Sequence, residues 1–128
     1  VSPLAAMLVA GILTSNPAGA EAIRVSDGDT FWMGDDRIRL WGIDAPEWDT
    51  VAGRAAETFL RNQLAGLDAS DLRCERRYRD PYERWVAQCF LPSGEDLACV
   101  LVRAGHARDW PKYSSGYYQR CKPDPAHF

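Results

Sequence analysis

Short hydrophobic segments separated by turn-forming residues predict that the first half of the chain is built from β-strands. Residues 22–25 form a first strand that stops at a cluster of turn-forming residues, and residues 30–33 resume the sheet. Residues 37–43 predict a third strand, whose alternation places Arg39 on the face opposite Ile38. The hydrophobic pattern therefore predicts three consecutive strands before the first helix.

The second part of the chain mixes helical and strand patterns. Residues 54–65 carry hydrophobic side chains on one face and predict an amphipathic helix. Residues 96–104 predict a second, more buried helix with Asp96 as its N-cap. Between them, residues 70–77 and 84–91 predict the two strands of a hairpin, whereas the aromatic segment 110–118 is typical of a loop. These elements predict an α+β domain with two to three helices, whose five strands form a small OB-type Greek-key β-barrel.

The first 20 residues differ from the rest of the chain. An almost unbroken hydrophobic run from Leu4 to Leu13 precedes the small residues 18–20, a pattern that signal peptidases cut. Residues 1–20 therefore predict a signal peptide, and residues 21–128 a secreted or periplasmic domain. The run is too short to span a bilayer, so we expect no stable membrane association once the signal is cleaved. A buried N-terminal helix is the alternative interpretation.

The length of 128 residues, with 46% hydrophobic and 26% charged residues, fits one globular domain. The net charge of −3 gives the molecule no general attraction for a polyanion, so nucleic-acid binding would require a local basic cluster. Residues 73–84 form such an arginine-rich stretch. Arginine suits phosphate because its planar fork donates two parallel hydrogen bonds. A solvated basic strand face is the alternative explanation.

The chain has four cysteines and no C-x-x-C spacing, so disulfides are favoured over a zinc or redox site. Three pairings are open from the sequence alone. If the two strands predicted after the first helix form a hairpin, Cys74 can face Cys89, which leaves Cys99 to pair with Cys121. Two disulfides indicate an oxidising compartment, in agreement with export.

Acidic residues gather at the predicted strand ends, where loops bring distant segments together. They are Asp27, Asp29, Asp44 and Glu47. Carboxylate oxygens without a nearby histidine or thiolate favour a hard cation such as Ca²⁺. Each acid alone is also a common turn former, so the metal hypothesis depends on the whole constellation.

Four segments of the chain closely resemble the staphylococcal nuclease family, in order and with compatible spacing. They are VSDGDT (25–30), IRLWGIDAPE (38–47), DPYER (80–84) and LVRAGHA (101–107). The resemblance extends from about Val25 to Tyr113. It implies a five-stranded OB-type barrel with helices and Ca²⁺-dependent endonuclease activity on DNA and RNA.

The resemblance implies a role for three of the acidic positions in these segments. Asp29 and Asp44 are similar to the two carboxylate ligands of the calcium ion, and the backbone carbonyl of Ala45 to a third ligand. Glu47 is similar to the residue that activates the attacking water. It follows a rigid proline, which favours a fixed position beside the metal ligands.

The resemblance also implies how the substrate is held. Arg39 and Arg84 are similar to the two arginines that grip the scissile phosphate, and Tyr82 and Tyr113 to tyrosines that flank the bound nucleotide. Without that resemblance, Arg39 would be a surface strand residue and Arg84 would form an ion pair with Asp80.

Three features depart from the family's pattern. Glu83 stands where glycine is common, Pro81 stands where lysine is common, and prolines interrupt the expected C-terminal helix after Cys121. The negative charge of Glu83 beside Arg84 is expected to lower the affinity for phosphate. None of these departures removes a proposed catalytic group.

Residue chemistry and resemblance together predict a monomeric, Ca²⁺-dependent nuclease with Arg39, Glu47 and Arg84 as catalytic residues and nucleic acid as substrate. A non-catalytic OB-type module that binds nucleic acid through aromatic stacking and a basic groove is the alternative. A structural domain without a nucleic-acid role would require the acidic and arginine positions to coincide by chance. The sequence leaves open the preference for DNA or RNA and the choice of endo or exo action.

Overall fold

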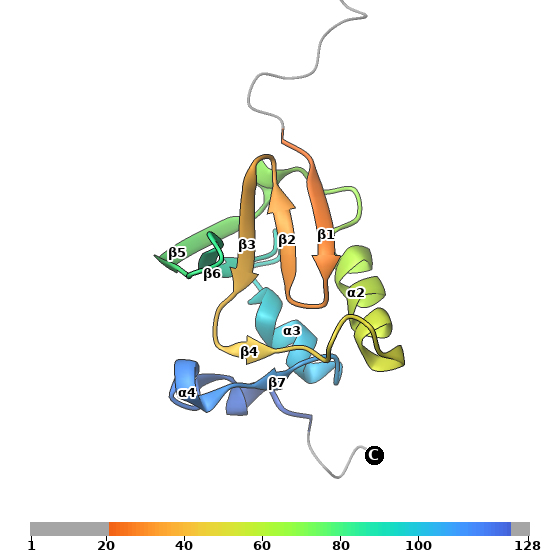
Figure 1. Cartoon of the computed structure of the whole chain (residues 1–128), viewed down its shortest axis with the longest axis vertical. Coiled ribbons are helices and arrows are strands. Elements are labelled where there is room, and N and C mark those ends of the chain that lie inside the picture. The colour runs from red at the N-terminus through yellow and green to blue at the C-terminus, as the bar shows by residue number, and fades with distance from the viewer. Residues whose placement is uncertain (1–20, 124–128) are drawn as a thin grey trace, which may run out of the picture.

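The computed structural model describes residues 21–123, which form a mixed α+β domain (Figure 1). The predicted signal peptide, residues 1–20, lies outside the described residues. The main sheet has five strands: β1 (Ile23–Asp27), β2 (Thr30–Met33), β3 (Asp36–Leu40), β6 (Trp85–Phe90) and β5 (Arg73–Arg79). Two short strands, β4 (Ile43–Asp44) and β7 (Arg108–Asp109), form a second small sheet. The predicted α+β class is confirmed.

The main sheet joins an antiparallel meander to a hairpin. β1, β2 and β3 lie side by side in chain order, joined by short turns (Figure 1). β3 then pairs in parallel with β6, and β6 pairs antiparallel with β5, as predicted for the hairpin. The strand order is therefore β1-β2-β3-β6-β5, and β3, which carries Arg39, lies in the middle of the sheet.

The prediction of a closed barrel is wrong, because this sheet stays open between β1 and β5. The chain that approaches the start of β1 is a 3₁₀ turn, η1 (Ala69–Asp71), rather than a strand. The carboxylate of Asp68 caps this turn and also accepts a hydrogen bond from the Glu21 amide. The Ala69 amide donates a single hydrogen bond to the Glu21 carbonyl at 3.1 Å. One bond from a turn cannot continue a ladder, so the sheet does not close.

The third strand is shorter than predicted, because the chain leaves the sheet after Leu40. Gly42 adopts φ +79°, a left-handed conformation that favours glycine. A Cβ at this position would also lie 2.9 Å from the ring of Tyr118. The turn directs Ile43–Asp44 away from the sheet, where it pairs with Arg108–Asp109. Both strands have only two residues, too few for a period to reveal them in the sequence.

Helix α2 (Val51–Leu64) begins three residues before the predicted start. Thr50 is its N-cap, and the Thr50 hydroxyl accepts a hydrogen bond from the Gly53 amide at 2.9 Å. The helix buries one face that includes Ala56 and Leu60 and packs beside β1. Its capped start directly follows the loop that carries Glu47, the residue predicted to activate water, so α2 anchors that loop.

The remaining helices are α3 (Leu97–Arg103), α4 (Pro111–Ser114) and the 3₁₀ segment η2 (Tyr117–Cys121). α3 is capped by Asp96, as predicted. The segment predicted as an aromatic loop is instead mostly helical. Pro111 at the first turn favours α4, and Ser115 and Gly116 adopt left-handed conformations that end it.

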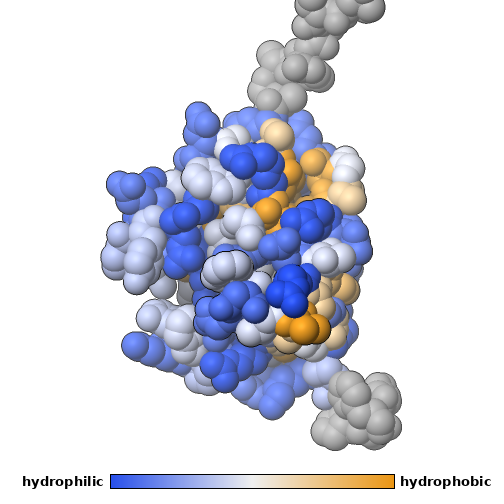
Figure 2. Space-filling view, turned by 45° about the vertical axis from the view of Figure 1, so that its right-hand side comes forward, coloured by the Kyte–Doolittle hydropathy of each residue, from blue (hydrophilic) through white to orange (hydrophobic). Residues whose placement is uncertain are grey.

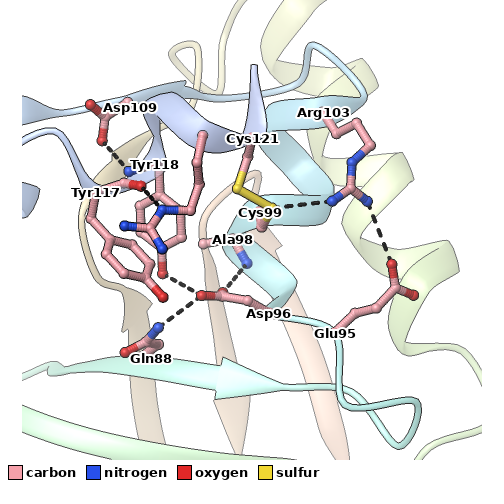
Figure 3. Close-up of a disulfide and its surroundings, with 11 residues drawn as sticks. Gln88, Glu95, Asp96, Ala98, Cys99, Arg103, Asp109, Tyr117, Tyr118 and Cys121 are labelled. Carbon is pink, nitrogen blue, oxygen red and sulfur yellow. Dashed lines mark hydrogen bonds and ion pairs between the residues drawn. A yellow bond between two sulfur atoms is a disulfide. The ribbon is translucent and has the colours of Figure 1, made fainter. Parts of the chain in front are cut away.

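Both predicted disulfides are confirmed. Cys74 and Cys89 lie directly opposite each other in β5 and β6, and Cys99 of α3 is joined to Cys121 of η2 (Figure 3). Next to the second disulfide, Tyr118 donates to the Asp96 carboxylate at 2.9 Å. Burial and the negative charge of Asp96 raise the pKa of Tyr118 far above its ordinary value, so the phenol remains a hydrogen-bond donor.

The hydrophobic core lies between the sheet and helices α2 and α3. It includes the fully buried Phe31, Ile38, Leu60, Leu97 and Leu101. The face shown in Figure 2 is largely polar, with hydrophobic residues in separate patches. Among residues 21–123, no helix combines the length and hydrophobicity needed to cross a membrane.

Candidate active site

All of the residues predicted for the site line one cleft of about 510 Å³. They come from the β1–β2 turn, β3, β4 and the loop after it, the β5–β6 connection and α4. The predicted residues in the cleft are Asp29, Arg39, Asp44, Ala45, Glu47, Tyr82, Arg84 and Tyr113. Segments up to 84 residues apart in the chain therefore meet at one place, with acids and arginines facing the same space.

Asp29 ties the β1–β2 turn to the end of β4. It is buried, and its Oδ2 atom accepts a hydrogen bond from the amide of Ala45 at 3.0 Å. Its Oδ1 atom accepts from the Thr30 hydroxyl at 3.0 Å, and its backbone carbonyl accepts from the Leu40 amide at 2.9 Å. These bonds fix the carboxylate beside the Asp44–Ala45 segment, where the predicted metal ligands were expected to converge.

Arg39 stands between the two predicted carboxylate ligands. Its Nη1 atom lies 3.3 Å from Asp29 Oδ2, and its Nη2 atom lies 3.8 Å from Asp44 Oδ1. Nη1 also donates to the carbonyls of Leu40 and Ile43, each at 2.9 Å. Arg39 is thus a largely buried, fixed cation in the cleft, not a solvated strand residue.

Arg84 is held by Asp80 through an ion pair of 2.7 Å from Nε to Oδ2. The other Asp80 oxygen accepts from the amides of Arg84 and Tyr82. Although burial acts to raise it, the pKa of Asp80 is lowered because the Arg84 amide and guanidinium donate to the carboxylate. The Nη atoms of Arg84 bond to no described residue, so their donors remain available in the cleft.

Glu83 adopts φ 62°, the left-handed region that favours glycine. This conformation gives a physical reason for the glycine that is common at this position of the resembling family. The turn is closed by the Asp80 amide donating to the Arg84 carbonyl and the Glu83 amide donating to the Asp80 carbonyl. The tight turn sets the direction in which Arg84 enters the cleft.

Glu47 lies in an exposed loop, and its backbone rather than its carboxylate is anchored. Its carbonyl accepts from the Thr50 hydroxyl at 2.7 Å and from the Thr50 amide at 3.1 Å. Gly53 packs so closely that a Cβ there would overlap the same carbonyl. Glu47 lines the cleft, and among the described residues no donor bonds to its carboxylate.

The acidic side of the cleft carries more negative charge than the predicted ligands alone. Burial raises the pKa of Asp27 to about 6, and the hydrogen bond and negative charge of Asp29 add to the shift. Three acids, Asp27, Asp29 and Asp44, therefore line the cleft with carboxylate oxygens from two separate segments, the end of β1 with its following turn and β4. Such hard donors suit a divalent cation such as Ca²⁺.

The fit to a metal depends on the predicted mixed ligand set. Within residues 21–123, no three His, Cys, Asp or Glu side chains are grouped as an all-side-chain metal site. The predicted set requires only the carboxylates of Asp29 and Asp44, the carbonyl of Ala45 and water. Both carboxylates already approach one cation, the Arg39 guanidinium, so their oxygens face a common point. The donors present are compatible with that set.

Several residues in the cleft or beside it were not predicted from the sequence. Arg108 of β7 lies 3.2 Å from Asp44 Oδ2, and the Trp110 ring lies 5.7 Å from the Arg39 guanidinium. Tyr78 and Trp48 also line the cleft. Arg108 reaches Asp44 only through the β4–β7 pairing, and no local pattern in the sequence could have revealed it.

A family model described as "Staphylococcal nuclease homologue" matches residues 37–123, which include every predicted site residue except Asp29. The chain belongs to the staphylococcal nuclease family. Members of this family generally depend on a metal ion. The family match rests on the sequence of residues 37–123 and does not depend on the geometry of the cleft.

Similar proteins carry different names. The chain is 32% identical over 127 residues to "Succinoglycan biosynthesis protein ExoI" of Rhizobium meliloti (strain 1021), covering 90% of this chain and 66% of that protein. It is 34% identical over 97 residues to "Uncharacterized endonuclease" of Escherichia coli O157:H7, covering 73% of this chain and 61% of that protein. "Endonuclease YhcR" of Bacillus subtilis (strain 168) is 28% identical, covering 76% of this chain and 10% of that protein. The chain thus spans less than two thirds of each relative's length.

Proposed function

We propose that this chain is a Ca²⁺-dependent nuclease that hydrolyses phosphodiester bonds of DNA and RNA. The observation that carries the proposal is the convergence of Asp29, Asp44, Glu47, Arg39 and Arg84 on one cleft. Two relatives named as endonucleases support the same reaction class. Hydrolysis of a phosphodiester requires stabilisation of negative phosphate oxygens and a base for the attacking water, and the cleft holds residues for both tasks.

The two arginines are proposed to grip the scissile phosphate. Arg84 enters from the β5–β6 connection with its Nη donors free of described partners, while its Nε is fixed by Asp80. Arg39 approaches from β3 and is fixed by backbone carbonyls. Fixed donors stabilise developing charge without reorganising during the reaction, which makes them more effective than water.

Glu47 is proposed as the general base. Glu47 lines the cleft and no described residue donates to its carboxylate, so it can accept a proton from a water that attacks the phosphate. The proposed Ca²⁺ ligands are Asp29, Asp44 and the carbonyl of Ala45. When bound there, the ion would supply positive charge that offsets the charge developing on phosphate oxygens.

Tyr82 and Tyr113 are proposed to flank the bound nucleotide. Both line the cleft and expose 70% and 42% of their surfaces, respectively, so an aromatic face is available to a base or sugar. Stacking on aromatic rings does not depend strongly on the base, which agrees with activity on both DNA and RNA.

We also propose that the protein acts as a monomer in a secreted or periplasmic compartment after removal of residues 1–20. The two disulfides support this location, because disulfides persist in oxidising compartments. Mass mapping of the mature protein from its host would test it. An N-terminus at residue 21 supports the proposal, and a retained hydrophobic segment in the cytoplasm contradicts it.

The site assignment is tested by Glu47→Gln and Arg39→Ala, assayed on single-stranded and double-stranded DNA. We expect each to lower kcat by about 10² to 10⁴-fold, because each removes a group acting on the reacting atoms. The matched controls are Glu75→Gln on β5 and Arg103→Ala on α3, both exposed and outside the cleft. Rates of Glu47→Gln or Arg39→Ala within a few-fold of the unmodified protein would contradict the mechanism. Stable binding without cleavage would instead favour the binding-module alternative.

A further inference from the structure

Three side chains form a row across the meander, outside the cleft. The antiparallel register places Arg24 of β1 opposite Trp32 of β2, and Trp32 opposite Arg37 of β3. Directly opposed residues project from the same face of a sheet. The guanidinium of Arg24 lies 5.4 Å from the Trp32 ring centre, and that of Arg37 lies 5.6 Å from it. We call these residues the Arg24–Trp32–Arg37 strip.

The strip leads directly to Arg39 and Arg84, the two arginines proposed to grip the scissile phosphate, which we call the phosphate clamp. β3 and β6 are parallel with Ile38 opposite Trp85, so one residue earlier on each strand brings Arg37 beside Arg84. Arg37 Nη2 donates to the carbonyl of Tyr82 at 2.8 Å, and the Arg84 guanidinium lies 5.4 Å from the ring of that same tyrosine. Tyr82 therefore joins the end of the strip to the cleft.

The strip and the clamp share one face of the sheet. Side chains alternate along a strand, so Arg37 and Arg39 of β3 project to the same side. Asp36 projects to the opposite side, where it pairs with Arg76 at 2.9 Å. The acid that precedes Arg37 in the chain therefore does not neutralise the strip.

The charges of the strip are available for a ligand. Neither Arg24 nor Arg37 forms an ion pair with any residue in the described part of the chain, and Arg24 is exposed. The Trp32 ring orders both guanidiniums by cation–π attraction. Apart from the bond from Arg37 Nη2 to the Tyr82 carbonyl, their N–H groups have no hydrogen-bond partner among the described residues and can donate to a ligand. In a molecule of net charge −3, this is a local basic feature rather than part of a general field.

We propose that the Arg24–Trp32–Arg37 strip binds the sugar–phosphate backbone of a nucleic-acid strand on one side of the scissile bond. Neighbouring strands lie about 5 Å apart, so the row from Arg84 to Arg24 crosses about 15 Å and accommodates more than one phosphate. Arg24 and Arg37 contact phosphates, and Trp32 is the residue that positions them. The proposal deepens the proposed nuclease function, and it assigns this face a preference for longer strands without base selectivity.

The strip is tested by equilibrium binding of a fluorescently labelled single strand of about 12 nucleotides, measured by anisotropy over a range of salt concentrations with Ca²⁺. The background is Glu47→Gln, which we expect to suppress cleavage. Each phosphate contact contributes about 0.7 to the slope of log affinity against log salt for a single strand. We expect Arg24→Gln to reduce the slope by about 0.7 and the Arg24→Gln, Arg37→Gln double variant by about 1.4.

The matched control is Arg76→Gln, which removes an equal charge that also contacts a tryptophan but lies on the other face, beside Trp85. We expect its slope to match that of the background protein. Arg37→Lys separates charge from structure, because it keeps the charge while losing the planar donor to Tyr82, and it should retain most of the slope. Slopes that stay unchanged in the double variant, or fall equally in Arg76→Gln, would overturn the proposal.

Cleavage assays distinguish failure of the strip from failure of the nuclease function. In the active protein, Arg24→Gln should raise KM for the long strand about fivefold, with little change for a dinucleotide that cannot reach Arg24. A protein that cleaves both substrates with no such length dependence contradicts the strip alone. A protein that cleaves neither contradicts the nuclease function, while the salt slopes still decide whether the strip binds nucleic acid.

Discussion

Glu83 occupies an unfavourable backbone conformation next to the proposed phosphate clamp. Its φ of 62° is one of two positive values among the non-glycine residues from 21 to 123. A side chain in the left-handed region costs about 1–2 kcal/mol relative to the ordinary region. The residue also places a carboxylate next in the chain to Arg84, where a phosphate is proposed to bind.

We predict that Glu83→Gly improves the site. Glycine adopts the required conformation without strain but is more flexible when unfolded, so we expect the free energy of unfolding to change by no more than about 1 kcal/mol. Loss of the nearby negative charge should lower KM for DNA several-fold at low salt, and less at high salt. Steady-state kinetics at two salt concentrations measure this. An increased KM would contradict the assigned role of Arg84.

Gly53 is required by a contact rather than by its backbone angle. In most helices, replacing glycine by alanine is favourable, because glycine loses more conformational entropy on folding. Here a Cβ would overlap the Glu47 carbonyl, which Thr50 also holds. The position therefore couples the start of α2 to the loop that presents Glu47.

We predict that Gly53→Ala lowers both stability and activity. The displaced Glu47 loop should cost about 1–3 kcal/mol in unfolding free energy, as for other overpacked positions. kcat should fall at least tenfold, because the proposed base moves. Ala55→Gly, at an exposed position of the same helix, serves as the control. It should lose about 1 kcal/mol with kcat unchanged. A more stable and fully active Gly53→Ala variant would contradict the proposed coupling.

For individual residues, the sequence was sufficient to predict which side chains line the cleft but not which ion pairs they form. The acids and arginines could be chosen because they lie in three of the four segments that resemble one family. The ion pair of Arg108 with Asp44 depends on the pairing of strands far apart in the chain, so no local pattern contains it. The Asp80–Arg84 pair, expected only in the absence of a functional role, coexists with the place of Arg84 in the cleft.

Among the elements, α3 and η2 are joined by a disulfide and by the hydrogen bond from Tyr118 to Asp96 (Figure 3). Tyr118 also contacts Gly42, the turn that directs β4 and Asp44 into the cleft. The η2 segment, although distant from the proposed chemistry, thus supports one side of the cleft. Its anchoring should affect the site as well as stability.

We predict that Cys99→Ala with Cys121→Ala destabilises the protein by about 3 kcal/mol, because the bridge closes a loop of 22 residues. Thermal unfolding measured by circular dichroism, with the Cys74–Cys89 disulfide intact, gives the value. KM for DNA should rise moderately as the Gly42 turn loosens. Melting at an unchanged temperature would contradict the stabilising role of this disulfide.

The elements that the sequence predicted are those with a clear period. Both strands of the hairpin and the N-cap of α3 followed from local patterns. The sequence left three cysteine pairings open, and the observed one is the pairing expected if the hairpin forms. The closed barrel did not, because closure depends on whether the two edges pair, and the chain next to β1 is a capped turn. The helical turns within residues 111–121 were not predicted, because the aromatic residues of this segment occur in loops as commonly as in short helices.

The whole molecule combines a weakly acidic net charge with a concentrated set of arginines beside the cleft. Nucleic acid would therefore be attracted by one face only, and its binding should weaken steeply with salt. On that face, acids from the β1–β2 turn, β4 and the loop after it meet arginines from β3 and the β5–β6 connection. Metal-assisted phosphodiester hydrolysis needs such an arrangement. The central claim is that these groups act together on one phosphate.

Digestion of plasmid DNA by the purified protein, with Ca²⁺ and with excess chelator, tests that claim most directly. We predict fragmentation with Ca²⁺, its loss with chelator, and recovery when Ca²⁺ is restored. Equal digestion in the presence of chelator would contradict the claim. So would intact plasmid in Ca²⁺ from a protein that remains folded and binds DNA.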